Sequence, residues 1–303
     1  MDISLLNLIS TPIAVLNTLG LDLKVGLSSD DPMAQRYLSE SYEGYLSIYS
    51  PEGTLADRVH LGQIPPESRR LFDVSSISRQ YVTGIDHMCV VHRVPSRIMS
   101  QVSAVEEIIQ MDEEPDYSFF RSMVEYSYPQ GGNGSVIYET PPGLNASPTS
   151  NTLTFSCQLV LSEVLNTYLV MINHSVNPEY SRIANYDFGI YSLDGEKIVQ
   201  DRVTVGPFGI KMVDLREVIP AFEIQRAKDA NDGISAFTLY GFSDDAALIY
   251  LVVNAARSLG SVAVEHTHPP QTYLFPYNAA DQRATKTNAI AGWKTIFSKS
   301  RNP

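Results

Sequence analysis

The sequence predicts an all-β fold of two tandem antiparallel β-sandwich units, jelly-roll-like in character, preceded by a short N-terminal helix. The first observation is a repeat, because residues 134–142 read GSVIYETPP and residues 260–270 read GSVAVEHTHPP. The second is a matching pair of upstream blocks, IYSPEG at 48–53 and IYSLDG at 190–195. Blocks that recur in the same order indicate a duplicated domain. The third is a series of short apolar runs bounded by Gly, Pro, Ser or Asp, which is typical of a sandwich or barrel.

Composition and charge restrict the class of protein. The 303 residues are 44% hydrophobic and 18% charged, which favours packed cores over extensive disorder. The formal net charge of −12 repels nucleic acid phosphates and anionic lipid, so neither is an expected partner. Only two cysteines are present, too few to suggest a disulfide scaffold. The start lacks the basic region of a signal peptide and no apolar run is long enough to span a membrane. We therefore expect a soluble, cytoplasmic protein without membrane insertion.

Four segments follow from the composition along the chain. We expect an N-terminal helical segment at 1–35, a first sandwich unit at 36–142 with an acidic insertion at 99–118, a second unit at 150–280, and a basic, aromatic tail at 281–303. Between the units, residues 141–148 are rich in Pro, Gly and Ser and have linker composition. The acidic insertion favours a solvated loop over a calcium loop, because the ligand spacing and turn glycine of a calcium loop are missing.

The N-terminal helix is predicted from its end signals. Thr11 can cap a helix, Pro12 fits a first helical turn and Gly20 fits the end. The apolar residues between them fall near one helical face, which we expect to pack on the body or on a neighbouring subunit.

Strand signals are clearest in the second unit. Its expected strands are 153–160, 167–173, 186–191, 198–205, 210–215, 236–242, 248–253 and 261–265. Turn residues separate these runs, and no stretch between them has convincing helical length, so parallel βαβ units are not expected.

Two further pairs of blocks recur. DRV stands at 57–59 and again at 201–203, and the offset from the preceding block implies two extra residues in the second turn. Asp73 and Asp214 each end a short strand. Adjacent Asp and Arg point to opposite faces of a strand. We therefore expect structural roles, with Arg reaching across to a neighbouring strand and Asp capping a turn.

A family resemblance follows from the second unit. The runs GIYSLD at 189–194, VTVGP at 203–207 and GSVAVEHT at 260–267, with Asp214 between them, resemble the sensory rhodopsin transducer family. The resemblance covers roughly residues 150–280, with a fainter echo at 40–142. It implies a β-sandwich that assembles as a homo-oligomer in the cytoplasm and acts by binding partners rather than by catalysis. This chain departs from the family in having two units and an acidic insertion.

His266 and His268 are the sharpest candidates for a metal site. Alternate residues of a strand share a face, so both imidazoles could bind one divalent ion. The alternative is structural, with the two histidines placed where a strand leaves the sheet before a Pro-Pro pair. No third ligand is identified and no other cofactor is expected. Glu139 and Glu265 occupy equivalent positions of the repeat and are a further candidate ligand pair.

The chain ends are the expected interfaces. Aromatic and apolar side chains gather there, and such residues are enriched in subunit contacts. The candidates are Tyr273, Phe275, Tyr277, Trp293 and Phe297 near the C-terminus, and Leu5, Leu8 and Leu16 near the N-terminus. The leading hypothesis is a non-enzymatic binding or assembly protein that forms homo-oligomers through its terminal segments and contacts a protein partner. The alternatives are a metal-dependent enzyme or small-ligand-binding module using the His pair, and a carbohydrate-binding β-sandwich.

Overall fold

A computed structural model gives the fold, and it describes residues 9–29, 41–99, 122–139, 152–175, 179–243, 246, 248–266 and 291. These residues form an all-β protein of four antiparallel sheets, as the sequence predicts. Within the described ranges, no helix has the length and apolar character needed to cross a membrane.

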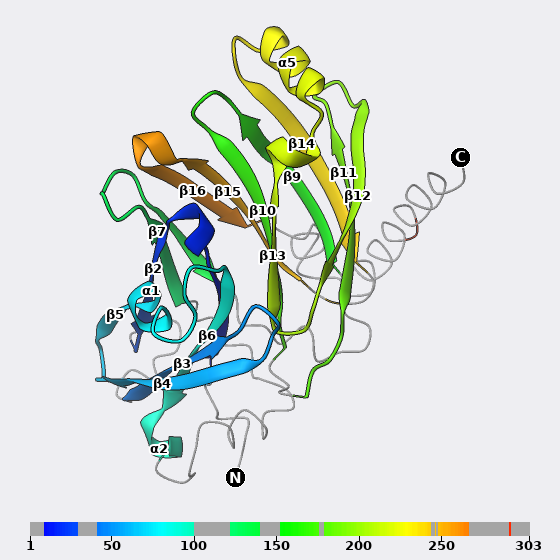
Figure 1. Ribbon diagram of the computed structural model, residues 1–303. Helices are drawn as coiled ribbons and strands as arrows, with labels where there is room; N and C mark the ends of the chain where they lie inside the picture. The colour runs from blue at the N-terminus through cyan, green and yellow to red at the C-terminus, as the bar shows by residue number, and fades with distance from the viewer. Residues whose placement is uncertain are drawn as a thin grey trace, which may run out of the picture.

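The first unit contains strands β1 to β8 and two short helices (Figure 1). Their bounds are β1 Ile9–Val15, β2 Asp22–Ser28, β3 Tyr42–Tyr49, β4 Leu55–Ile64, β5 Arg69–Asp73, α1 Val74–Ser78, β6 His87–Pro95, α2 Ser96–Met99, β7 Ser122–Ser127 and β8 Ser135–Glu139.

The second unit contains strands β9 to β16 and helices α4 and α5. Their bounds are β9 Thr152–Leu161, β10 Asn166–Asn173, β11 Ala184–Tyr191, β12 Lys197–Val205, β13 Gly209–Asp214, α4 Leu215–Val218, α5 Ala221–Ala230, β14 Ser235–Ser243, β15 Ile249–Ala256 and β16 Ser261–His266. Each of the eight strands expected in this unit is found within a few residues of its predicted position. Helix α5 was not expected.

The two units have the same topology, strand for strand. The sheets of the first unit have the orders β1-β6-β3-β4 and β5-β2-β7-β8, and those of the second have β9-β14-β11-β12 and β13-β10-β15-β16. Adding eight to each strand number of the first unit gives the second. The IYSPEG and IYSLDG blocks fall at matching places on the β3–β4 and β11–β12 hairpins, and the two GSV blocks begin at the matching strands β8 and β16. A common origin of the units by duplication stays a prediction that this correspondence supports.

The prediction of an N-terminal helix is wrong over residues 9–15, which form β1. This strand pairs antiparallel with β6, and Pro12 is tolerated because β1 lies at the edge of its sheet. Among residues 9–29, which are the described part of this segment, the helical ones are Asn17–Leu19, in one 3-10 turn that ends at Gly20 in the left-handed region, with φ of 70°. Leu16 is 1% exposed, so its side chain belongs to the core and not to a subunit interface.

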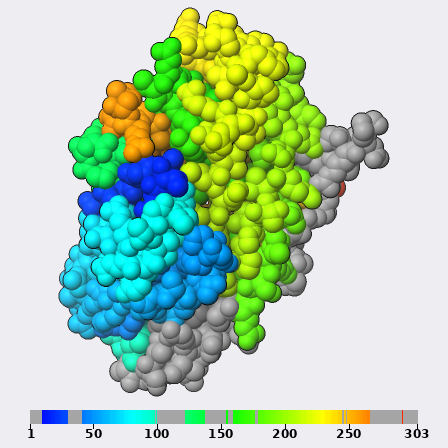
Figure 2. All heavy atoms as spheres, viewed as in Figure 1, coloured from blue at the N-terminus to red at the C-terminus, as the bar shows by residue number. Residues whose placement is uncertain are grey.

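The sheet β13-β10-β15-β16 is covered on both faces, so its side chains contribute to two apolar cores. Val170, Ile172, Leu251 and Val253 point into a core shared with the first unit. The alternating positions on β10 and β15 point into the core of the second unit; among them are Leu169, Met171, Tyr250 and Val252. The units are therefore joined by a continuous apolar core, and Figure 2 shows them in contact.

The junction between the units is also tight at the backbone. A Cβ on Gly53, in the β3–β4 turn, would overlap the carbonyl oxygen of Pro207, and a Cβ on Gly132 would overlap that of Gly260. The ring of Tyr49 stacks on Phe208 with centroids 5.1 Å apart. The Val262 amide donates to the Asn133 carbonyl at 3.0 Å, so β8 and β16 meet side by side.

The DRV blocks are not equivalent in register. The β3–β4 and β11–β12 turns are equally long, and each hairpin has a bulge next to its turn, which pairs Ile48 with Asp57 and Ile190 with Val199. The expected two extra residues in the second turn are therefore absent. Both arginines still reach across their hairpins, since Arg58 donates to Ser47 at 2.8 Å and Arg202 to Asp187 at 2.7 Å.

The predicted capping aspartates are confirmed. Asp73 accepts from the Ser76 amide at the start of α1, and Asp214 accepts from the Arg216 amide at the start of α4, each at 2.8 Å. Residues 100–121, which include most of the acidic insertion, and the linker residues 141–148 lie outside the described residues.

Candidate functional site

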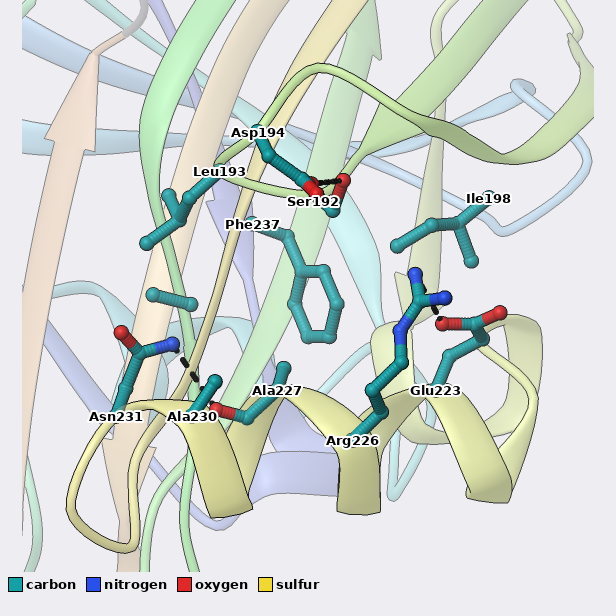
Figure 3. Close-up of a pocket in the computed structure, with 11 residues that line it drawn as sticks. Ser192, Leu193, Asp194, Ile198, Glu223, Arg226, Ala227, Ala230, Asn231 and Phe237 are labelled. Atoms are coloured by element: carbon teal, nitrogen blue, oxygen red, sulfur yellow. Dashed lines mark hydrogen bonds and ion pairs between the residues drawn. The ribbon is translucent and has the colours of Figure 1, made fainter.

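A cavity of about 360 Å³ lies in the second unit, between α5, the β11–β12 hairpin and β14 (Figure 3). Figure 1 places α5 at the end of this unit that is remote from the first unit. Side chains from all three elements surround the cavity; they are Ser192, Leu193, Asp194, Ile198, Glu223, Arg226, Ala227, Ala230, Asn231, Ala236 and Phe237.

Helix α5 forms from local signals that are individually weak. Pro220 precedes the first residue, and Ala, Glu, Gln, Arg and Lys fill most of the ten positions. The helix ends where Asp232 and Gly233 take positive φ values of 49° and 89°. Ile224 and Ala227 pack on the core of the second unit, and Ser235 donates a hydrogen bond to the Ile224 carbonyl at 2.7 Å. The helix is thereby fixed above β14.

The floor and one end of the cavity are apolar. Phe237 on β14 has no exposed surface and lies at the centre of the site in Figure 3. Leu193 at the hairpin tip is 59% exposed, which is high for a large apolar side chain. The remaining apolar lining comes from small residues and from Ile198.

Arg226 is held between two carboxylates. One of its terminal nitrogens, Nη2, lies 2.8 Å from Glu196 Oε2 and 2.8 Å from Glu223 Oε2. The hydrogen bond to Glu196 raises the pKa of the Arg226 guanidinium, and the charges of Glu223 and Asp194 act in the same direction. The guanidinium is therefore engaged by the protein itself.

Asp194 is held on the opposite side of the cavity by the hairpin turn. The Ser192 hydroxyl donates to Asp194 Oδ1, and this bond lowers the pKa of the Asp194 carboxyl. Ser192 Oγ also accepts from the Glu196 amide at 3.0 Å, which closes the turn. The carboxylate is ionised at neutral pH and its position is fixed.

Glu223 is the buried polar side chain of the site. The residue is only 8% exposed, yet it lines the cavity. Its Oε2 accepts no hydrogen bond from the described residues, although Arg226 approaches it to 2.8 Å. The two groups are thus close as an ion pair without the alignment that a hydrogen bond needs.

The residues predicted from sequence lie elsewhere. His266 is the last residue of β16, opposite Leu251, and Glu265 is exposed on the same strand. Glu139 ends β8, the strand beside β16. The side chains of His266 and Glu139 are outside the description. Beyond the described residues altogether lie His268, Tyr273, Phe275, Tyr277, Trp293, Phe297, Leu5 and Leu8.

The hypotheses attached to those residues stay predictions. Among the side chains that the structure describes, no group of three His, Cys, Asp or Glu is placed to hold a metal ion. Apart from Leu16, which is in the core, the residues predicted to mediate assembly lie outside the described ranges. The sequence predicts a turn at 193–196 and no helix at 221–230, so it does not reveal Asp194, Glu223 and Arg226 as members of one site.

Comparisons with known proteins give faint likenesses. No protein-family model and no curated protein matches the chain. Among solved structures, it is similar to Thermotoga maritima 1070, at 10% identity and a TM-score of 0.29, over 39% of this chain and 92% of that one. It is also similar to a β-glucuronidase from glycoside hydrolase family 2, at 11% identity and a TM-score of 0.22, over 85% of this chain. A putative β-galactosidase from Bacteroides fragilis follows, at 10% identity, a TM-score of 0.17 and 84% of this chain.

The chain spans 23% of the β-glucuronidase and 32% of the β-galactosidase. At these TM-scores the likenesses carry no argument about function. The site must therefore be interpreted from its own residues.

Proposed function

We propose that this chain is a non-enzymatic binding protein whose second unit holds a small ligand in the cavity beneath α5. The observation that carries the proposal is that α5 and its cavity belong to one of two units with the same topology. Features present in both units serve the shared fold, whereas a feature added to one unit is not required by that fold.

The connections between equivalent strands define the addition. In the first unit, residues 74–86 connect β5 to β6 and are all described; they contain α1 and no further helix. In the second unit, α4 matches α1, and α5 follows it before β14 begins. The connection at 215–234 is thus the longer of the two, and α5 is the helix that it contains in addition; one side of α5 borders the cavity.

The lining suits a ligand. Small-molecule sites combine apolar walls with a few fixed polar groups, at volumes of roughly 300–1,000 Å³. Here Leu193 and Ile198 supply apolar surface above the buried ring of Phe237, while Asp194 and Glu223 supply fixed acceptors. The cavity of about 360 Å³ lies at the lower end of the range, which favours a small ligand.

A cavity-filling substitution tests the proposal. Ala227→Leu places a larger side chain on the cavity side of α5, and Ala221→Leu makes the same change at an exposed position of that helix outside the cavity. Both residues have high helix propensity, so the helix itself is preserved. We expect compounds that raise the Tm of the full chain to lose this effect in Ala227→Leu and to keep it in Ala221→Leu.

The compounds for this test are hexylammonium, hexanol, D-glucose and D-galactose, measured by thermal unfolding. The sugars address the carbohydrate-binding alternative directly. A ligand that stabilised both variants equally would bind elsewhere and would contradict the assignment of the site. So would a failure of all four compounds to stabilise the chain.

A further inference from the structure

We propose that Asn133 is a site of self-modification, where the asparagine converts to aspartate and isoaspartate and thereby loosens the contact between β8 and β16. This inference does not depend on the cavity beneath α5. It rests on the sequence of one turn, on the exposure of that turn, and on the hydrogen bond that the turn makes to the second unit.

The sequence of the turn is the first observation. Asn133 is followed by Gly134, and no other Asn-Gly pair occurs among the 303 residues. Asparagine is one of the thermolabile residues of proteins. Because glycine has no Cβ, the backbone nitrogen of Gly134 meets little steric hindrance when it approaches the carbonyl carbon of the Asn133 side chain.

The exposure of the turn is the second observation. Of the asparagines that the structure describes, Asn133 is the exposed one, whereas the others are half-buried or buried. The turn is also open before this residue, since a Cβ placed on Gly131 would have no atom within 4 Å. Figure 2 shows the turn between β7 and β8 at the surface, beside the residues that lead into β16. Water and hydroxide therefore reach the Asn133 side chain.

The reaction needs water and base and no other reactant. The Gly134 nitrogen loses its proton to base and attacks the side-chain carbonyl carbon of Asn133. The new C–N bond closes a cyclic succinimide, and the side-chain nitrogen leaves as ammonia. Water then opens the ring: attack at the side-chain carbonyl gives aspartate, and attack at the main-chain carbonyl gives isoaspartate. No group is oxidised or reduced.

The contact with the second unit is the third observation. The Asn133 carbonyl accepts from the Val262 amide at 3.0 Å. Ser135, two residues further on, accepts from the Val264 amide through its side-chain oxygen at 2.9 Å. These two bonds join the start of β8 to β16.

Isoaspartate is incompatible with the present geometry of this contact. The main chain then runs through the side-chain carbon of residue 133, and the carbonyl that binds the Val262 amide becomes a carboxylate outside the main chain. The chain between Gly132 and β8 is also longer by one carbon. It has no room to shift toward the second unit, because even a Cβ on Gly132 would overlap the Gly260 carbonyl oxygen. The bond from Val262 is therefore weakened or lost.

Ageing of the full chain tests the site. The folded protein is kept in mildly alkaline buffer, and peptide mapping by mass spectrometry with enzymatic labelling of isoaspartate follows every asparagine. We expect the peptide that contains Asn133 to gain the mass difference between an amide and a carboxyl, and to carry the isoaspartate label, before any other asparagine does. Asn133→Gln keeps an amide at this exposed position but needs a larger ring, so its peptide should stay unchanged.

Thermal unfolding tests the effect on the contact. The isoaspartate fraction of the aged protein is separated and compared with Asn133→Asp, which has the same added charge and an unaltered main chain. Loss of one hydrogen bond between the units predicts a Tm about 2 °C lower for the isoaspartate fraction than for Asn133→Asp.

Each other outcome overturns a stated part of the inference. An Asn133 that stays unchanged in the folded protein, or converts only after unfolding in urea, would overturn the site. The same mass change in the Asn133→Gln peptide would place the reaction at another residue and would also overturn it. An isoaspartate fraction as stable as Asn133→Asp would overturn the loosening of the contact.

Discussion

The β3–β4 hairpin of the first unit and the β11–β12 hairpin of the second have the same turn, but the first turn is packed against the other unit and the second is not. Each turn closes with the same pair of backbone hydrogen bonds, from Ser50 and Gly53 in one and from Ser192 and Gly195 in the other. Gly53 is pressed against the Pro207 carbonyl of the second unit, whereas nothing lies within 4 Å of a Cβ placed on Gly195. The first turn fastens the two units together, and the second is free to border a cavity.

The difference teaches that the local sequence determines the turn and the tertiary neighbours determine its use. Both glycines have positive φ, 83° at Gly53 and 90° at Gly195, so each is required by its own turn. Contact with the other unit distinguishes the first turn from the second. The second turn instead has α5 beside it, linked through the ion pair of Arg226 with Glu196.

The largest expected effect is the pH dependence of the junction. His92 on β6 is buried between β1 and β3, with each ring nitrogen 2.8 Å from a serine hydroxyl. Burial lowers its pKa well below the usual value, and Arg58 and His174 act in the same direction. Burial lowers the pKa of His174 to about 3.

Both histidines are neutral in the folded protein and take up protons on unfolding below pH 6.5. Stability is therefore complete above that pH and falls as the pH decreases toward the folded-state values. Between pH 7 and 5 we expect a loss of about 4 kcal/mol, roughly half from each histidine. Urea unfolding at several pH values measures it. His174→Gln should halve the slope, and an unchanged slope would show that His174 is not a buried neutral group.

The next largest effect is the loss of stability when a methyl group is added at the first turn. In Gly53→Ala the added methyl group stands at a residue with positive φ and overlaps the Pro207 carbonyl. We therefore expect the free energy of unfolding to fall by about 3 kcal/mol or more. Gly195→Ala is the matched control and should cost about 1 kcal/mol, from the backbone conformation alone. Denaturant unfolding of both variants gives the comparison. Equal losses would mean that the first turn is not held against the second unit.

The smallest effect concerns a feature that the units share. Asp73→Ala and Asp214→Ala remove equivalent helix caps and should each cost about 1 kcal/mol. Similar values would support the strand-for-strand equivalence of the units. A much larger loss at Asp214 would instead reveal the contribution of its second bond, from Asn166 at 2.9 Å.

Much of the fold could be predicted because its signals are local. The strands of the second unit are apolar runs between turn residues, and the capping role of Asp73 and Asp214 follows from their place at strand ends. The error at β1 has a tertiary cause. Thr11, Pro12 and Gly20 resemble helix ends, but pairing with β6 outweighs those preferences.

The candidate site could not be predicted for two physical reasons. Helix α5 is polar along most of its length, so it lacks the apolar periodicity that indicates a helix, and its stability comes from packing on β14. Asp194, Glu223 and Phe237 are far apart in sequence and meet only when the hairpin, helix and strand are assembled. The non-equivalence of the DRV blocks was likewise hidden, because only the strand pairing shows that the two turns are equally long.

The sheet that is covered on both faces has a consequence for any attempt to divide the molecule. A chain cut between β8 and β9 would leave Val170, Ile172, Leu251 and Val253 facing water on one side of the second unit. An apolar surface of that kind promotes association and aggregation. Neither half is therefore a natural building block for fusion or for expression alone, and useful fragments of this protein will have to keep both sandwiches.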